Sequence, residues 1–174
     1  DKLSPAQVTV PVLIVQHMPA SFTSILAEHI RRSTQWNAQE AVAGEKLTPG
    51  EIRIAPGGHH LVLAGKGLNR TLELSDEAPV NFCRPSADVL FLSAVEHFGS
   101  GVFAVILTGM GHDGAQGGQA IKAAGGRVFA QDKETSVVWG MPGAAVAAGV
   151  VDKVLPLPEL GPAVSMVMGG SSRC

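Results

Sequence analysis

Apolar positions in the first part of the chain follow two different periodicities. Val8 to Val15 is β-branched and nearly all apolar, which is typical of a buried parallel strand. Pro11 interrupts this run, so the pattern predicts that the strand begins after that residue. From Phe22 to Arg32 the apolar side chains recur at helical spacing instead. The pattern therefore predicts a strand followed by a helix, whose core-facing side chains would be Phe22, Ile25, Leu26 and Ile30.

The middle of the chain has shorter strand signals. Glu51 to Ala55 predicts a short strand that ends at a proline and two glycines. Leu61 to Leu63 and Thr71 to Leu74 lie on either side of Gly65-Lys66-Gly67, which is a hairpin signal. We therefore expect the segment from Glu51 to Leu74 to form an antiparallel addition to a larger sheet.

Strands and helices alternate regularly in the remainder. Ser86 is a predicted N-cap for an apolar helix, and Gly99 lies beyond the end of that helix. The later elements are predicted as strand Val102 to Leu107, helix Ala115 to Ala124, strand Arg127 to Ala130, a short helix from Pro142, strand Val151 to Leu155 and helix Glu159 to Met168. This alternation predicts an α/β fold, with a doubly wound, mostly parallel sheet flanked by helices on both faces.

Composition narrows the choice of function. The length of 174 residues fits one domain, and 45% hydrophobic residues fit a globular chain. With a net charge of −2 and no basic stripe, nucleic acid is not an expected partner. The apolar runs are short and interrupted, so we expect no membrane insertion. The cysteines, Cys83 and Cys174, do not suggest a disulfide framework, which fits a cytoplasmic protein.

The strongest candidates for chemistry are His17 and Asp113, because each follows a predicted strand. In open α/β sheets, ligands bind beyond the carboxyl ends of the strands. An imidazole at that edge could act as a general base, and a carboxylate could accept its N–H and stabilise the imidazolium. The structural alternatives are a histidine that is hydrogen-bonded only to support the strand end, and an aspartate that caps the helix starting at Ala115.

The glycine-rich turn before that helix permits two interpretations. Gly109 and Gly111 allow tight backbone turns, and the Met110 amide could donate to a developing oxyanion. Gly109 to Gly114 also matches the G-x-G-x-x-G fingerprint of dinucleotide-binding loops. However, Asp113 would place a negative charge where that loop must receive a pyrophosphate.

Several further residues are weaker candidates. Arg84 lies next to a predicted helix start, where it could bind an anionic or carbonyl group of a substrate. Met141 lies in a turn on the same predicted edge and could contact a substrate. His59 and His60 are adjacent, and side chains of adjacent residues on extended backbone point to opposite faces, so the pair is unsuited to chelating a metal. We expect neither a metal ion nor a cofactor.

Several motifs taken in order resemble a known family. They run from about Pro11 to Leu157 and comprise Gln16-His17-Met18-Pro19, Ile54-Ala55-Pro56-Gly57, Arg84-Pro85-Ser86-Ala87-Asp88-Val89-Leu90-Phe91, Ile106 to Ala115, Ala130-Gln131 and Gly140-Met141-Pro142. This set resembles the catalytic domain of the chemotaxis protein-glutamate methylesterases, the CheB type. Several long motifs in one order are far more specific than any one of them.

The resemblance implies a fold, a reaction and a set of residue roles. It implies hydrolysis of glutamate methyl esters on the cytoplasmic helices of chemoreceptors, with release of methanol, and deamidation of receptor glutamines. It implies a Ser-His-Asp triad on a doubly wound sheet. His17 would be the base, Asp113 its orienting acid and Met110 the source of an oxyanion amide, while Gly109, Gly111, Arg84 and Met141 would contact substrate.

The sequence departs from the family pattern at its start. The family's nucleophile lies in a Gly-x-Ser-Thr-Gly-Gly turn after a first strand, and residues 1–9 contain no such turn. We therefore expect residues 1–174 to be a single catalytic domain without its first strand, its nucleophile turn and the phosphoacceptor regulatory domain. Two alternatives are a receptor-binding module without catalysis and, less favoured, a dinucleotide-binding domain.

Overall fold

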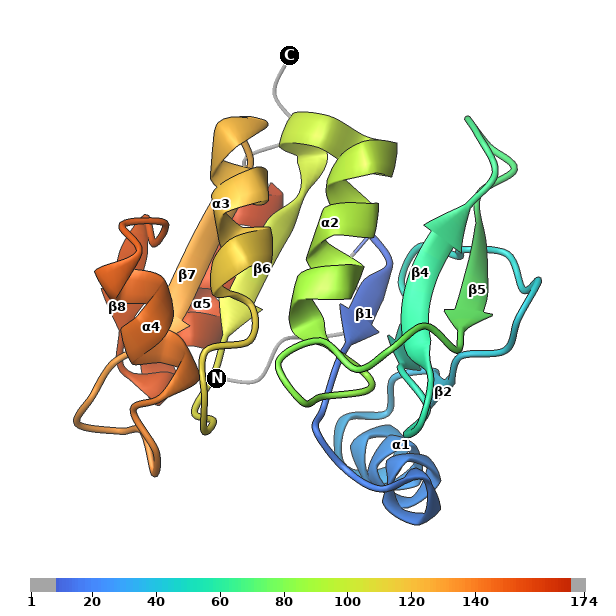
Figure 1. The fold of residues 1–174 in the computed structure, drawn as a ribbon, viewed down its shortest axis with the longest axis horizontal. Coiled ribbons are helices and arrows are strands. Elements are labelled where there is room, and N and C mark those ends of the chain that lie inside the picture. Colours follow the sequence, from blue (N-terminus) through green and yellow to red (C-terminus); the bar gives the residue numbers. More distant parts are fainter. Residues whose placement is uncertain (1–8, 170–174) are drawn as a thin grey trace.

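The computed structural model describes residues 9–169, so Cys174 and the segment before Thr9 lie outside the described part (Figure 1). The elements are β1 (Val12–Ile14), α1 (Ala20–Thr34), β2 (Ala38–Glu40), β3 (Ile52–Ile54), β4 (His60–Ala64), β5 (Thr71–Ser75), α2 (Ala87–Phe98), the 3₁₀ turn η2 (Gly99–Gly101), β6 (Phe103–Ile106), α3 (Ala115–Ala123), β7 (Arg127–Gln131), α4 (Met141–Ala147), β8 (Lys153–Leu155) and α5 (Leu157–Gly169).

The first half contains a three-stranded parallel sheet in the order β1-β3-β2. The sequence did not predict β2, which is short and carries only one buried side chain, Ala38. The expectation that the Glu51 strand belongs to an antiparallel addition was wrong, because β3 lies between β1 and β2 and is parallel to both. The predicted hairpin is confirmed, with β4 and β5 antiparallel in a sheet of their own.

Helix α1 turns only part of its predicted apolar face to the core, because Leu26 and Ile30 pack there but Phe22 and Ile25 do not. Phe22 is 49% exposed and Ile25 is 61% exposed, whereas Thr23 and Ala27 are buried. The Thr23 hydroxyl donates to Glu40 Oε1 at 2.5 Å and accepts the Gly57 amide at 3.1 Å. Polar partners on β2 and on the loop after β3 therefore fix the orientation of the helix, which a count of apolar residues cannot detect.

The second half contains another three-stranded parallel sheet, in the order β6-β7-β8. Figure 1 shows α3 and α4 in front of these strands and α5 behind them. Ala104, Ile106 and Val128 form its core with Ile121 of α3 and Ala145 of α4. The α/β fold with helices on both faces is thus confirmed, but the parallel strands divide between two sheets.

Helix α2 joins the two halves. Leu90 packs in the core beneath the hairpin, while Phe91 and Val95 pack against the core of the second sheet. The two sheet edges formed by β1 and β6 lie on either side of this helix (Figure 1). Within residues 9–169, β1 pairs only with β3, and β6 only with β7. No helix of the described part is long and apolar enough to cross a membrane.

Candidate functional site

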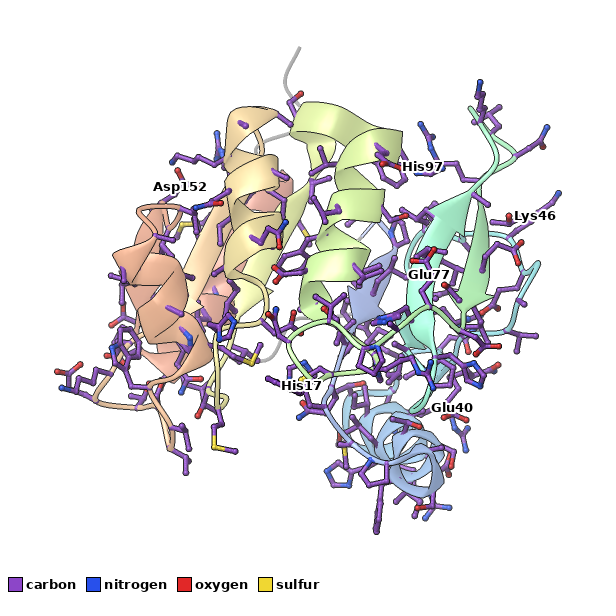
Figure 2. The ribbon with its side chains drawn as sticks, in the orientation of Figure 1. His17, Glu40, Lys46, Glu77, His97 and Asp152 are labelled. Atoms are coloured by element: carbon purple, nitrogen blue, oxygen red, sulfur yellow. The ribbon has the colours of Figure 1, made fainter. Side chains whose placement is uncertain are left out.

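The site lies at the carboxyl edge of the parallel strands. β1 ends at Ile14 and leads into the loop that carries His17, while β6 ends at Ile106 and leads into the turn that carries Asp113. His17 Nε2 and Asp113 Oδ2 are 2.7 Å apart although the residues are far apart in sequence. Figure 2 shows His17 below the segment that leads into α2. The parallel topology therefore brings the two predicted side chains into direct contact.

Asp113 is 2% exposed and accepts hydrogen bonds from the start of α2. The amides of Ala87 and Asp88 donate to its oxygens at 2.6 and 3.1 Å, and the Ser86 hydroxyl donates at 2.7 Å. The N-cap position of α3, at Gly114, has no side-chain hydrogen bond. Asp113 thus does cap a helix, but it caps α2 and not the helix that follows it in sequence.

These contacts keep the Asp113 carboxylate ionised. Burial opposes ionisation, but the donors from His17, Ser86, Ala87 and Asp88 outweigh it and hold the pKa of Asp113 well below its usual value. An ionised carboxylate can only accept, so His17 Nε2 must carry the proton in the contact. The neutral imidazole then has its lone pair on Nδ1. The pair therefore presents a basic nitrogen that faces away from Asp113.

Asp88, in the first turn of α2, plays the corresponding capping role for α3. Its carboxylate is buried and accepts the Gly117 amide at 2.7 Å. Burial and the neighbouring Asp113 charge raise the pKa of Asp88, although the Gly117 and Asn81 hydrogen bonds counteract them. Because this carboxylate already occupies the N-terminus of α3, the loop from Gly109 to Gly114 lacks the free anion site that a dinucleotide pyrophosphate needs.

Ser86 and His60 form a supporting layer behind Asp113. Ser86 was predicted as the N-cap of α2, and it holds that position, but its hydroxyl donates to Asp113 and makes no cap bond. The Ser86 amide donates to Nδ1 of the fully buried His60, whose Nε2 contacts the Ala78 carbonyl at 3.2 Å. His59, which precedes β4, is partly exposed and contacts Asp76 Oδ1, so the two histidines have separate partners.

The turn before α2 brings two residues to the site that the sequence did not indicate. Asn81 Nδ2 donates to Asp88 at 2.9 Å and contacts Asp113 at 3.4 Å. The Sγ atom of the free cysteine Cys83 lies within 4.8 Å of one ligand atom of His17 and of one of Asp113. The three side chains are of metal-binding type, but both Asp113 oxygens already accept hydrogen bonds. Burial and the Asp113 charge raise the pKa of Cys83, which disfavours the thiolate that metal binding or nucleophilic attack needs.

The remaining predicted residues surround this pair in different ways. Gly109 lies against Met141, because a Cβ on the glycine would come within 2.5 Å of the methionine sulfur, and Met141 packs at the core of the second sheet. Met110 is 83% exposed at the loop tip, and Gly111 follows with a φ of +90°. Arg84 Nη1 donates to the carbonyls of Asp76 and Glu77. These contacts are structural, so substrate binding by Arg84 and Met141 stays a prediction.

Comparison with known proteins places this geometry in context. The crystal structure of the Thermotoga maritima CheB methylesterase catalytic domain superimposes with a TM-score of 0.91 at 38% identity, covering 94% of this chain and 87% of that one. A protein-glutamate methylesterase/protein-glutamine glutaminase of group 2 operon from Rhodopseudomonas palustris is 54% identical over 92% of the chain. A protein-glutamate methylesterase/protein-glutamine glutaminase 1 from Paramagnetospirillum magneticum is also 54% identical, over 87% of the chain.

The similarity covers only part of those relatives. The chain spans 41% of the Rhodopseudomonas protein and 40% of the Paramagnetospirillum protein. The family model described as CheB methylesterase matches residues 1–164, which include every residue of the site described above. With its extent, its fold and its close relatives in agreement, the chain belongs to the CheB methylesterase family.

Proposed function

We propose that the chain is the catalytic domain of a protein-glutamate methylesterase that also deamidates glutamine. The observation that carries the proposal is the 2.7 Å contact between His17 Nε2 and Asp113 Oδ2 in a chain of this family. The relatives' names state both activities. Both reactions proceed through acyl transfer at a side-chain carbonyl, with methanol leaving in one and ammonia in the other, so one site serves both.

His17 and Asp113 act as base and orienting acid. Asp113 holds the proton on Nε2, so Nδ1 takes the proton of an attacking hydroxyl as the hydroxyl oxygen bonds to the ester carbonyl. The imidazolium that forms is stabilised by the ionised Asp113. The tetrahedral intermediate then expels the methoxy group, which takes the proton from Nδ1 and leaves as methanol. Water hydrolyses the acyl-enzyme by the same steps and regenerates the hydroxyl.

The attacking hydroxyl belongs to a serine in the family's Gly-x-Ser-Thr-Gly-Gly turn, which follows a strand that lies between β1 and β6. Two features support this placement. β1 and β6 each have one side without a strand partner among residues 9–169, and unpaired edges are unfavourable in the middle of a parallel fold. A parallel strand inserted there would also end at the carboxyl edge, where His17 lies. We infer that the serine lies N-terminal to β1.

The loop after β6 stabilises the oxyanion through the Met110 amide. Among the described residues this amide makes no hydrogen bond, and the left-handed Gly111 shapes the loop beside it. Gly109 supports the loop by accepting the Met141 amide at 2.8 Å. We assign Met110 as the oxyanion donor, and the backbone of Gly109 and Gly111 as the surface that faces the scissile group.

The substrate we propose is the methylated cytoplasmic helices of chemoreceptors, and the reaction takes place in the cytoplasm. The Rhodopseudomonas and Paramagnetospirillum relatives are more than twice as long as the matched region, which leaves room for the phosphoacceptor regulatory domain. We infer that this domain is the second partner of the site.

The test is methanol release from a methylated receptor fragment by the natural protein at full length. We expect His17→Ala to lower turnover by at least about 10³-fold while receptor affinity stays unchanged, because the substitution removes the base without removing a binding surface. His29→Ala is the matched control, since His29 is exposed on α1. Normal turnover in the His17 variant would contradict the triad. Receptor binding without methanol release by the unmodified protein would indicate a binding module instead.

A further inference from the structure

A tight turn at the site holds a bulky residue in an unfavourable backbone conformation. Val80 and Cys83 exchange two backbone hydrogen bonds, of 3.1 and 2.8 Å, around Asn81 and Phe82. Both central residues have positive φ, +52° for Asn81 and +64° for Phe82, as a type I′ turn requires. Asparagine suits the first central position, but the second favours glycine. A phenylalanine there is a true conformational outlier.

Packing does not explain this phenylalanine. The Phe82 side chain is fully exposed at 101%, so the ring contributes no burial to the stability of the described structure. Backbone strain of this kind persists only where surrounding contacts hold it, and it gathers at ligand contacts. The exposed ring and the strained φ at one residue therefore require a reason outside the fold.

The turn is fastened directly to two buried carboxylates, Asp88 and Asp113. Asn81 Nδ2 donates to Asp88 at 2.9 Å and contacts Asp113 at 3.4 Å, while the Cys83 thiol contacts the Asn81 carbonyl at 3.4 Å. Cys83 also lies within 4.8 Å of the His17 and Asp113 ligand atoms. The residues on either side of Phe82 are thus part of the site, and the turn holds the Phe82 backbone beside it.

We propose that Phe82 is a substrate-contact residue, which packs on apolar side chains of the receptor helix one turn from the methylated glutamate. This inference rests on the proposed function. Residues three and four positions apart share a helix face, so a ring beside the site meets the neighbours of the glutamate that enters it. An aromatic ring supplies a large contact area at low entropic cost. The ring therefore selects a helical protein substrate over a small ester.

The experiment compares Phe82→Asn with Leu68→Asn in the full-length protein. Asparagine tolerates positive φ, so the turn survives while the ring is lost. Leu68 is the matched control, because it is 100% exposed in the loop between β4 and β5. For a methylated receptor fragment, we expect Phe82→Asn to raise KM about tenfold with kcat within twofold, as loss of a well-placed aromatic contact does. Phe82→Tyr keeps the aromatic ring and should have the same KM as the unmodified protein.

Two further measurements separate this contact from a structural role. Hydrolysis of a small glutamate methyl ester should not change in Phe82→Asn, and its melting temperature should stay the same or rise as the strain is relieved. An unchanged KM, an equal loss on the small ester, or a lower melting temperature that Phe82→Tyr does not correct would overturn the inference. Higher activity would also overturn it, by showing that another segment of the protein covers the ring. Absence of methanol release by the unmodified protein would instead refute the proposed function.

Discussion

The N-termini of α2 and α3 are each capped by a buried aspartate from outside that helix, but the two aspartates differ in their other contacts and in their pKa values. Asp113, which precedes α3, caps the amides of α2, and Asp88, in the first turn of α2, accepts an amide of α3. Both carboxylates are buried. The pKa of Asp113 lies below its usual value because His17 and Ser86 add donors, whereas the pKa of Asp88 is raised by burial and by the Asp113 charge.

At Asp113, the carboxylate that accepts the α2 amides is the same one that contacts His17. The α2 amides hold the carboxylate still and ionised, and that same carboxylate fixes the proton on His17. The sequence offered a cap of the helix that starts at Ala115 as the alternative to catalysis, whereas the structure shows that Asp113 caps α2. This cap is compatible with the catalytic role that we propose. Asp88 accepts the Gly117 amide and the Asn81 side-chain amide, and it makes no hydrogen bond to a histidine among the described residues.

The most direct test of the difference between Asp113 and Asp88 is to neutralise each carboxylate in turn. Asp113→Asn would place an NH₂ group against His17 and favour the tautomer with its lone pair on Nε2. We expect methanol release to fall by about 10⁴-fold. Asp88→Asn keeps an acceptor for the Gly117 amide, so we expect it to change turnover by less than about tenfold. Steady-state kinetics of both variants on one receptor fragment would measure the difference.

Circular dichroism of both variants is the control for folding. If Asp88→Asn lost as much activity as Asp113→Asn while both remained folded, the division between a catalytic and a structural aspartate would be wrong. The two carboxylates would then act as one unit, coupled through Asn81, which contacts both.

The sequence predicts most elements of the fold but not the contacts between them. Among residues 9–169, long apolar runs and punctuation by glycine or proline located the five α-helices and every strand except β2, whose three residues carry no apolar run. The contact between His17 and Asp113 could be anticipated, because parallel strands end at one edge. The role of Asp88 could not, because Asp88 and Gly117 are 29 positions apart and meet only through the packing of α2 on α3. The role of Phe82 could not be predicted either, because phenylalanine does not favour the positive φ that it has in the folded chain.

Because α2 and α3 pack closely, each aspartate can cap the neighbouring helix. A substitution that pushes the two helices apart should therefore weaken both capping contacts. A Cβ at Gly117 would lie 2.5 Å from Phe91 Cβ and 3.2 Å from the Asp88 backbone. We expect Gly117→Ala to lower the free energy of unfolding by about 2–3 kcal/mol, because overpacking exceeds the gain of about 1 kcal/mol in helix propensity.

Gly118→Ala is the matched control in the same helix. Its Cβ would lie 3.0 Å from the Val150 side chain and would meet no backbone atom, a milder clash than the 2.5 Å approach at Gly117. We expect its stability to stay within about 1 kcal/mol of the unmodified chain. Urea unfolding of both variants would measure the difference, and equal destabilisation would show that the α2–α3 contact is not the constraint.

The two aspartates should also make opposite contributions to the change of the free energy of unfolding with pH. An aspartate in the unfolded chain has a pKa of about 3.9. Because Asp113 has a lower pKa when folded, its contribution is complete above about pH 4–5 and is lost as the pH falls toward its folded pKa. Asp88 has a raised pKa when folded, so the native state takes up that proton first, and protonation of Asp88 favours the native state as the pH falls.

The slope of stability against pH, measured by urea unfolding between about pH 3 and 6, should therefore distinguish the variants. Asp113→Asn removes the group that makes stability rise with pH, so its slope should be shallower than that of the unmodified chain. Asp88→Asn removes the opposing group and should be steeper. Since both substitutions remove one carboxylate of the same pair, a shared loss of charge cannot produce opposite changes. A shallower slope in Asp88→Asn would mean that Asp88, like Asp113, is held ionised by its helix, and the comparison between the two N-termini would fail.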